Sequence, residues 1–290
     1  MATPAGLLLA SPPVISGVAA MAACAAMAVF YVAVLYAPTV ILRFPPPTSL
    51  RTFLHRRFAC AAVASAASVL ATASLLRVWS LSDFADMFAV FGIRKDHLIQ
   101  AVAIPLLLTS LVYAGSFVAR VWLLVSSWGG GDEVEIGCAQ RLAQWIQAAV
   151  ADVMVWRNYV VAPFTEELVF RACMIPLLLC GGFKMSTIIF LSPIFFSLGV
   201  QLGYTVIFGW YATFLLIRTG NLLCPIIAHV FCNMMGLPVF SSPRTKGAAL
   251  VAFLAGSIAF FWLLFPATSP ELYNSSFDRC SCWHGFCNWK

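Results

Sequence analysis

Long apolar runs separated by short polar breaks make up most of the chain, and no alternation of apolar and polar residues typical of β-strands is present. A membrane-spanning helix needs about 20 predominantly apolar residues. Runs of about that length cover residues 14–37, 58–78, 101–126 and 247–266. The pattern predicts an all-α protein in which each of these runs is a membrane span.

The second half of the chain continues the helical pattern with more polar interruptions. Residues 142–157 form a helical segment that Asp152 interrupts, and residues 158–180 and 221–237 are apolar helices that carry polar side chains. Between these two helices, residues 185–217 form an uncharged run of 33 residues, which barely accommodates two spans. We therefore expect a polytopic bundle of about seven or eight transmembrane helices.

Composition supports a membrane protein and excludes other classes. The 290 residues are 62% hydrophobic and 10% charged, with a mean hydropathy of +0.92, which no ordinary soluble domain matches. The net charge of +6 is not gathered in the dense Lys/Arg clusters of nucleic-acid-binding proteins. The start of the chain lacks the basic segment of a cleavable signal peptide, so we expect the first helix to remain as a span.

The connection between the first two runs indicates the orientation. It contains four arginines, Arg43, Arg51, Arg56 and Arg57. Cytoplasmic loops carry an excess of Lys and Arg, so this connection is predicted to lie in the cytosol. The prolines at 45–47 predict that it is extended and non-helical.

Three regions are predicted along the chain. Residues 1–128 are N-terminal membrane helices, and the Gly-rich, acidic loop "WGGGDEVEIG" separates them from a membrane core at 129–266. Residues 267–290 form a Cys-rich tail. The spacing of its cysteines, Cys280, Cys282 and Cys287, matches no standard zinc or disulfide pattern. We interpret the tail as a plain surface segment and most other cysteines as packing residues.

The stretch "PFTEELVFR", residues 163–171, places three ionisable side chains inside an apolar helix. A charge at membrane depth costs at least ~2.5–3.5 kcal/mol, so such residues usually mark function. Glu167 and Arg171 are four residues apart and share a helix face, so they can form an ion pair. Glu166 points about 100° away and stays available as a general base. A structural ion pair alone explains Glu167 and Arg171 but not Glu166.

A second polar pair lies in "AHVFCN", where His229 and Asn233 share one helix face. A lone histidine on an apolar helix is more often a packing residue, but the asparagine makes two donors that can stabilise an oxyanion. A zinc site built from Glu166, Glu167 and His229 is the alternative. No H-E-x-x-H motif is present, and zinc would compete with Arg171 for Glu167, so we expect no metal and no cofactor.

The motifs "EELVFR" and "HVFCN" resemble the E-E-x-x-x-R and H-x-x-x-N motifs of the type II CAAX prenyl endopeptidases, the Ras-converting-enzyme family of the ABI group. The tail "FFWLLFPATSPELYN" is similar to the eukaryotic branch. The resemblance implies a multi-pass enzyme of the endoplasmic reticulum that removes the last three residues from farnesylated or geranylgeranylated proteins. It implies that Glu166 activates water, that Glu167 and Arg171 support it, and that His229 and Asn233 form the oxyanion site.

The chain departs from the family pattern at one place. Family members carry an additional histidine motif, F-x-x-A-H, between the two motifs above, and that histidine helps to hold the water. Here the corresponding stretch, "SPIFFSLGVQLGY", contains no histidine. We expect a segment to be missing at this junction and the activity of this form to be low.

Two alternatives remain open. One is a non-catalytic scaffold of the same fold, which the absent histidine favours. The other is a transporter that uses the two glutamates as a proton relay, which leaves His229 and Asn233 unexplained. Aromatic residues near the motif, including Phe164 and Phe170, are candidates to line a prenyl site, although helix packing explains most of them.

Overall fold

A computed structural model describes residues 15–80, 84–127, 138–197, 204–240, 243–245 and 247–273, and all regular structure within them is helical. The α-helices are α1 (Gly17–Val40), α2 (Leu50–Leu75), α3 (Phe84–Ala89), α4 (Leu98–Val112), α5 (Ala114–Ser127), α6 (Cys138–Ala151), α7 (Val153–Trp156), α8 (Ala162–Glu167), α9 (Met174–Cys180), α10 (Met185–Ser197), α11 (Tyr204–Thr219), α12 (Leu223–Met235) and α13 (Ala248–Ala267). Short 3₁₀ turns lie at Val78–Ser80, Pro243–Thr245 and Pro270–Leu272. The predicted all-α fold is confirmed.

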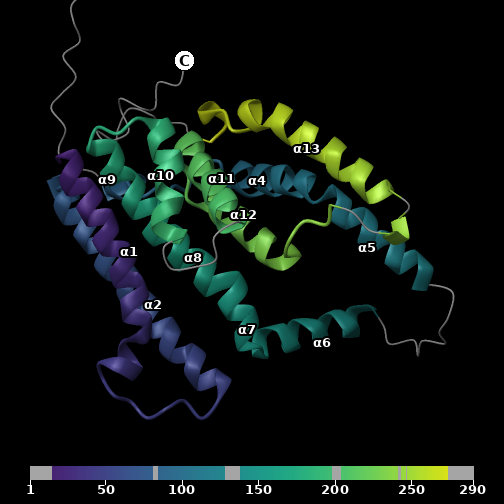
Figure 1. Cartoon of the computed structure of the whole chain (residues 1–290), viewed down its shortest axis with the longest axis horizontal. Helices are drawn as coiled ribbons and strands as arrows, with labels where there is room; N and C mark the ends of the chain where they lie inside the picture. The colour runs from purple at the N-terminus through teal and green to yellow at the C-terminus, as the bar shows by residue number, and fades with distance from the viewer. Residues whose placement is uncertain are drawn as a thin grey trace, which may run out of the picture.

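The helices form a bundle with α8 to α12 in its centre (Figure 1). The helices α1 and α2 pack against each other along one side, whereas α4, α5 and α13 pack together on the other. One buried cluster joins Cys24 and Met27 of α1 to Met174 and Leu178 of α9. A second cluster joins α4 to α11 and α12. Each cluster therefore draws on both halves of the chain.

Three helices among the described residues are long and apolar enough to cross a membrane, namely α1, α2 and α13. The predicted third span is two helices, α4 and α5, which are bent by 75°. Glycines allow α13 to lie closely against this bend, because a Cβ on Gly115 would sit 2.6 Å from the carbonyl oxygen of Ala249 and one on Gly256 would clash with Leu111. The helices α10, α11 and α12 are apolar but shorter, so the count of seven or eight spans stays a prediction.

The second helix begins earlier than predicted. It starts at Leu50 rather than at residue 58, because the side chain of Ser49 accepts a hydrogen bond from the backbone N–H of Thr52 at 3.2 Å and caps the helix. Three of the four arginines assigned to an extended connection therefore lie on α2, namely Arg51, Arg56 and Arg57.

Residues 153–180 form one nearly continuous rod through the centre of the bundle. The carboxylate of Asp152 accepts a hydrogen bond from the N–H of Met154 at 2.8 Å, which starts the rod and separates it from α6. The interruption predicted at Asp152 is thus confirmed. Within the rod, α7, α8 and α9 are joined by two π-helical segments, Arg157–Val161 and Leu168–Cys173.

Two predictions fall partly or wholly outside the described residues. The junction with the absent histidine lies at residues 198–203, between α10 and α11, and the cysteines of the tail lie beyond Tyr273. The uncharged run at 185–217 does form two helices, as predicted. The division of the chain into residues 1–128, 129–266 and 267–290 stays a prediction.

Candidate active site

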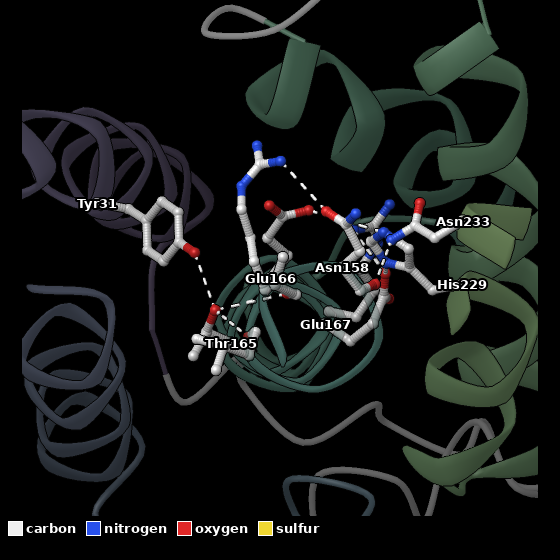
Figure 2. Close-up of polar contacts among 11 residues, drawn as sticks. Tyr31, Asn158, Thr165, Glu166, Glu167, His229 and Asn233 are labelled. Carbon is white, nitrogen blue, oxygen red and sulfur yellow. Dashed lines mark hydrogen bonds and ion pairs between the residues drawn. The ribbon is translucent and has the colours of Figure 1, made fainter. Parts of the chain in front are cut away.

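The glutamates lie at the end of α8, a single α-helical stretch between the two π-helical segments. A π-helical turn holds one more residue than an α-helical turn and is frequent at functional sites. The rod crosses the bundle beside α2 and α12, which both contact it. Figure 2 shows Glu166, Glu167, His229 and Asn233 gathered where α8 meets α12.

Glu167 is the centre of a buried polar network. Its side chain and that of Arg171 are fully buried. The Nη1 of Arg171 donates to Oε1 of Glu167 at 3.2 Å, so the predicted ion pair is present. The Nδ1 of His229 lies 2.8 Å from the same oxygen. This shared oxygen ties α12 to the rod, and the pairing of His229 with Glu167 is a contact that the sequence pattern did not predict.

The protonation of His229 follows from this contact. An ionised Glu167 carboxylate accepts the hydrogen bond from Arg171 and has no proton to donate. The Nδ1 of His229 must therefore carry the hydrogen and donate it to Glu167. In the neutral ring this leaves Nε2 as an acceptor, directed toward the neighbouring glutamate.

Glu166 is positioned differently from Glu167. Its side chain is 23% exposed, and its Oε2 lies 3.9 Å from Nε2 of His229. That distance is too long for a direct hydrogen bond, so the carboxylate is free to contact a third group. As predicted, Glu166 does not pair with Arg171, so its carboxylate is the one of the two that is available to act as a base.

Asn233 lies one turn beyond His229 on α12. Its Nδ2 donates to the backbone carbonyl of Asn158 in the first π-helical segment, at 2.8 Å. An amide nitrogen has two hydrogens, so one remains to bind another acceptor. His229 and Asn233 are thus both on α12 and both contact the rod, with the asparagine at the exposed edge of the site.

On the other side of α8, a hydroxyl pair fixes the rod to the first helix. The hydroxyl of Tyr31 lies 3.0 Å from Oγ1 of Thr165, which itself donates to the carbonyl of Val161 at 2.7 Å (Figure 2). Thr165 directly precedes Glu166. The position of α1 therefore bears directly on the residue beside the predicted base.

Two cavities meet beside Glu166. One has a volume of about 220 Å³, and its lining includes Glu166, Phe170 and two arginines, Arg57 and Arg157. The other has a volume of about 660 Å³, lies between α2 and the rod, and is lined almost entirely by apolar atoms, including those of Phe164. Both cavities are bordered by Phe58, Val161 and Thr165, so they adjoin. The two arginines were not among the predicted site residues.

No group of three metal-ligating side chains is arranged to hold an ion in the part of the chain that the structure describes. Glu167 has two partners through one oxygen, namely Arg171 and His229, as expected for a carboxylate held by hydrogen bonds. The arrangement is able to hold and deprotonate a water molecule at Glu166, and to present donors beside it.

Comparisons with known proteins agree on one family. The family model described as "Type II CAAX prenyl endopeptidase Rce1-like" matches residues 149–235. The curated protein "CAAX prenyl protease 2" of Arabidopsis thaliana is 50% identical over 303 residues, covering 93% of this chain and 96% of the relative. The protein of the same name from Homo sapiens is 29% identical over 290 residues, covering 87% and 82%. No solved structure matches the chain.

The alignment lengths bear on the predicted missing segment. The Arabidopsis alignment has 303 positions, whereas 93% of this 290-residue chain is about 270 residues, so roughly 30 positions of that relative face no residue here. The human alignment, with 290 positions over 87% of the chain, leaves roughly 40. A missing internal segment leaves unmatched positions of this kind, and its place at the junction between α10 and α11 stays a prediction.

Proposed function

Because the chain belongs to the type II CAAX prenyl endopeptidases, a family of membrane proteases, we propose that it cleaves the peptide bond after the prenylated cysteine of CAAX proteins and releases the C-terminal tripeptide. The observation that carries the proposal is the contrast at Glu166 and Glu167. One carboxylate is held by Arg171 and His229, and its neighbour faces a cavity with no direct hydrogen bond to His229.

The proposed reaction uses water as the nucleophile. A water molecule beside Glu166 and Nε2 of His229 donates one hydrogen to each, which directs its lone pair away from both groups. Glu166 takes the proton as the water attacks the scissile carbonyl. When the tetrahedral intermediate collapses, Glu166 returns the proton to the leaving amine, so the products are a prenylcysteine carboxylate and a free tripeptide.

The remaining residues position this chemistry. Asn233 donates its second N–H to the oxyanion, while its first N–H stays on the carbonyl of Asn158. Glu167 and Arg171 hold His229 in the tautomer whose Nε2 accepts a hydrogen from the water. The role of His229 therefore shifts from oxyanion donor, as the sequence suggested, to water-holding group.

The apolar cavity supports a prenylated substrate. Its volume of about 660 Å³ falls within the ~300–1,000 Å³ typical of ligand sites, and it adjoins the cavity that contains Glu166. A farnesyl or geranylgeranyl chain in this groove places the attached cysteine beside the base. We assign the protein to the endoplasmic-reticulum membrane, with the arginine-rich end of α2 in the cytosol.

We also propose that this form is impaired. Without the additional histidine, His229 alone assists Glu166 in holding the water, and loss of one such preorganised group should cost about 10²–10³-fold in rate, as loss of one oxyanion donor does. The experiment expresses this chain and a form with the histidine segment restored, in cells lacking their own enzyme. Tripeptide release from a farnesylated CAAX peptide is compared at matched protein level. Equal release by both forms would refute the impairment and the need for the additional histidine.

The second candidate function is a non-catalytic membrane scaffold, which the absent histidine favours. The same experiment separates the two functions. If the restored form releases the tripeptide and Glu166→Gln abolishes this release, the reaction is identified. If both forms bind prenylated peptide and neither releases the tripeptide, the protein is a scaffold. Chelators should leave release unchanged, and activity restored by adding zinc to stripped protein would replace the water mechanism with a metal one.

A further inference from the structure

The smaller cavity beside Glu166 contains two cations that the proposed reaction does not use. Arg57 comes from α2 and Arg157 from the first π-helical segment of the rod, and both line the cavity with Glu166. Among the residues that the structure describes, Glu166 is the one acidic residue in its lining. In the part of the chain that the structure describes, neither arginine forms an ion pair with a carboxylate. The cavity is therefore suited to an anionic group.

The guanidinium of Arg57 is held by aromatic rings rather than by an acid. It lies 5.5 Å from the ring centre of Tyr36 and 5.3 Å from that of Phe53. Such contacts restrain the plane of the guanidinium while leaving its N–H groups available. Arg157 donates one N–H to Oδ1 of Asn158 at 3.2 Å, which orients it and leaves its other donors available.

The substrate of the proposed reaction carries one anionic group at a fixed distance from the scissile bond. Three extended residues span at most about 10 Å, so the free α-carboxylate of the tripeptide lies about that far from the bond that is cleaved. Along the rod, Arg157 and Glu166 are nine residues apart, which at 1.5 Å per residue places their Cα atoms about 13 Å apart. The long arginine side chain is able to cover the difference.

Arg171 cannot serve this purpose. Its side chain is fully buried and donates to Glu167, whereas Arg157 is exposed and Arg57 half-buried at the cavity. The cavity is also close to the predicted cytosolic end of α2, because Arg51 and His55, one turn nearer to its start, line an adjacent cavity with Trp156. A cytosolic C-terminus would enter from that side.

We infer that Arg57 and Arg157 bind the C-terminal carboxylate of the tripeptide and so fix the cleavage position three residues from the end of the substrate. The inference rests on the proposed function. Binding of the carboxylate by a guanidinium fork is the arrangement that distinguishes a free chain end from an internal segment. A lipid phosphate, like a carboxylate, is an anion that guanidinium groups bind, so an anionic lipid headgroup is the competing ligand.

The test measures binding, so it does not depend on activity. Full-length protein in nanodiscs of phosphatidylcholine alone is titrated with a fluorescent peptide that ends in S-farnesylcysteine and an aliphatic tripeptide. The scissile bond is replaced by a methylene-amine, and the C-terminus is either a carboxylate or a carboxamide. An unprenylated carboxylate peptide is the third ligand. The variants are Arg57→Gln with Arg157→Gln, Arg57→Lys, and the control Arg56→Gln, which removes a neighbouring charge outside the cavity lining.

We expect the unmodified protein to bind the carboxylate at least roughly tenfold more tightly than the carboxamide, since hydrogen bonds to charged groups carry that much affinity. The double variant should bring this ratio close to one with unchanged carboxamide affinity, which also shows that it is folded. Arg57→Lys should retain part of the preference and Arg56→Gln all of it.

Other outcomes separate the inference from the proposed function. A ratio near one in the unmodified protein, or a ratio unchanged in the double variant, overturns the inference, while tighter binding of the farnesylated peptides still supports the proposed function. A third outcome is that the double variant loses affinity for the carboxylate and the carboxamide peptide alike, and only in nanodiscs that contain phosphatidylserine. That result assigns the arginines to lipid headgroups and also overturns the inference. Equal binding of farnesylated and unprenylated peptides removes the proposed function and the inference with it.

Discussion

The two sides of α8 place a glutamate side chain in different surroundings. Glu167 lies on the buried side, where Arg171 and His229 bond to one of its oxygens and solvent is excluded. Glu166 lies on the open side, toward the cavity bordered by α1 and α2. The first carboxylate has little freedom to react, and the second has little to hold it in place. The difference shows that burial and hydrogen-bond partners, rather than residue type, distinguish the two carboxylates.

The largest effect is expected on the buried side, from Arg171→Ala. This change leaves the carboxylate of Glu167 buried without its cation, which typically costs about 3–5 kcal/mol. We expect poor expression and a clear fall in the thermal unfolding temperature of detergent-purified protein. Normal unfolding together with lost activity would place Arg171 in contact with substrate instead.

On the open side, Glu166→Gln should remove catalysis without removing the fold. The amide keeps the size of the side chain but cannot accept the proton from water, so tripeptide release by the histidine-restored form should fall at least ~10²-fold. The unfolding temperature should stay close to that of the parent. Glu167→Gln is the matched control, and it should lower both activity and stability. Wild-type release by Glu166→Gln would end the assignment of the base.

Gly209→Ala tests how tightly α11 packs against α10 and Arg171 on the buried side of the rod. A Cβ at this position would lie 2.8 Å from Cβ of Pro193 and 3.3 Å from Nη2 of Arg171. Forcing α10 and α11 apart should cost about 1–3 kcal/mol, measured as a lower unfolding temperature. An unchanged unfolding temperature in Gly209→Ala would show that this contact is loose.

The smallest effect is expected from the hydroxyl pair on the open side. Thr165→Val keeps the shape of the side chain and removes its bond to Tyr31, a loss of about 0.5–1.5 kcal/mol. Tyr31→Phe should cost a similar amount, and the double variant should cost less than the sum of the two. Strict additivity of the unfolding free energies would indicate that the two hydroxyls do not interact.

Local spacing predicted the parts of the site that depend on one helix. The Glu167–Arg171 pair follows from a separation of four residues, and the π-helical segment between them does not remove it because four residues still return to nearly the same face. The pairing of His229 with Glu167 depends on how α12 packs on the rod, which no local pattern specifies. The family resemblance named the residues, but only packing shows which glutamate holds the histidine.

Arg57, one of the two arginines of the cavity, was missed for a different reason. The prolines before Ser49 led to an extended connection, and the arginines after it were interpreted only as an orientation signal. The start of α2 after Ser49 could have been predicted from the sequence, since serine is a favoured N-cap residue. The 75° bend between α4 and α5 could not be predicted, because no proline marks the break.

The two π-helical segments determine where the rod tolerates a change in the number of its residues. Each segment accommodates one residue more than an α-helical turn, so deleting a single residue from Arg157–Val161 would restore an α-helix there. Because the π-helical turn held one residue more, the residues before the deletion would keep nearly the same orientation relative to Glu166 and Glu167. A deletion within the α-helical stretch of α8 would instead rotate them by about 100°. Single-residue deletions should therefore be tolerated better in Arg157–Val161 than in α8.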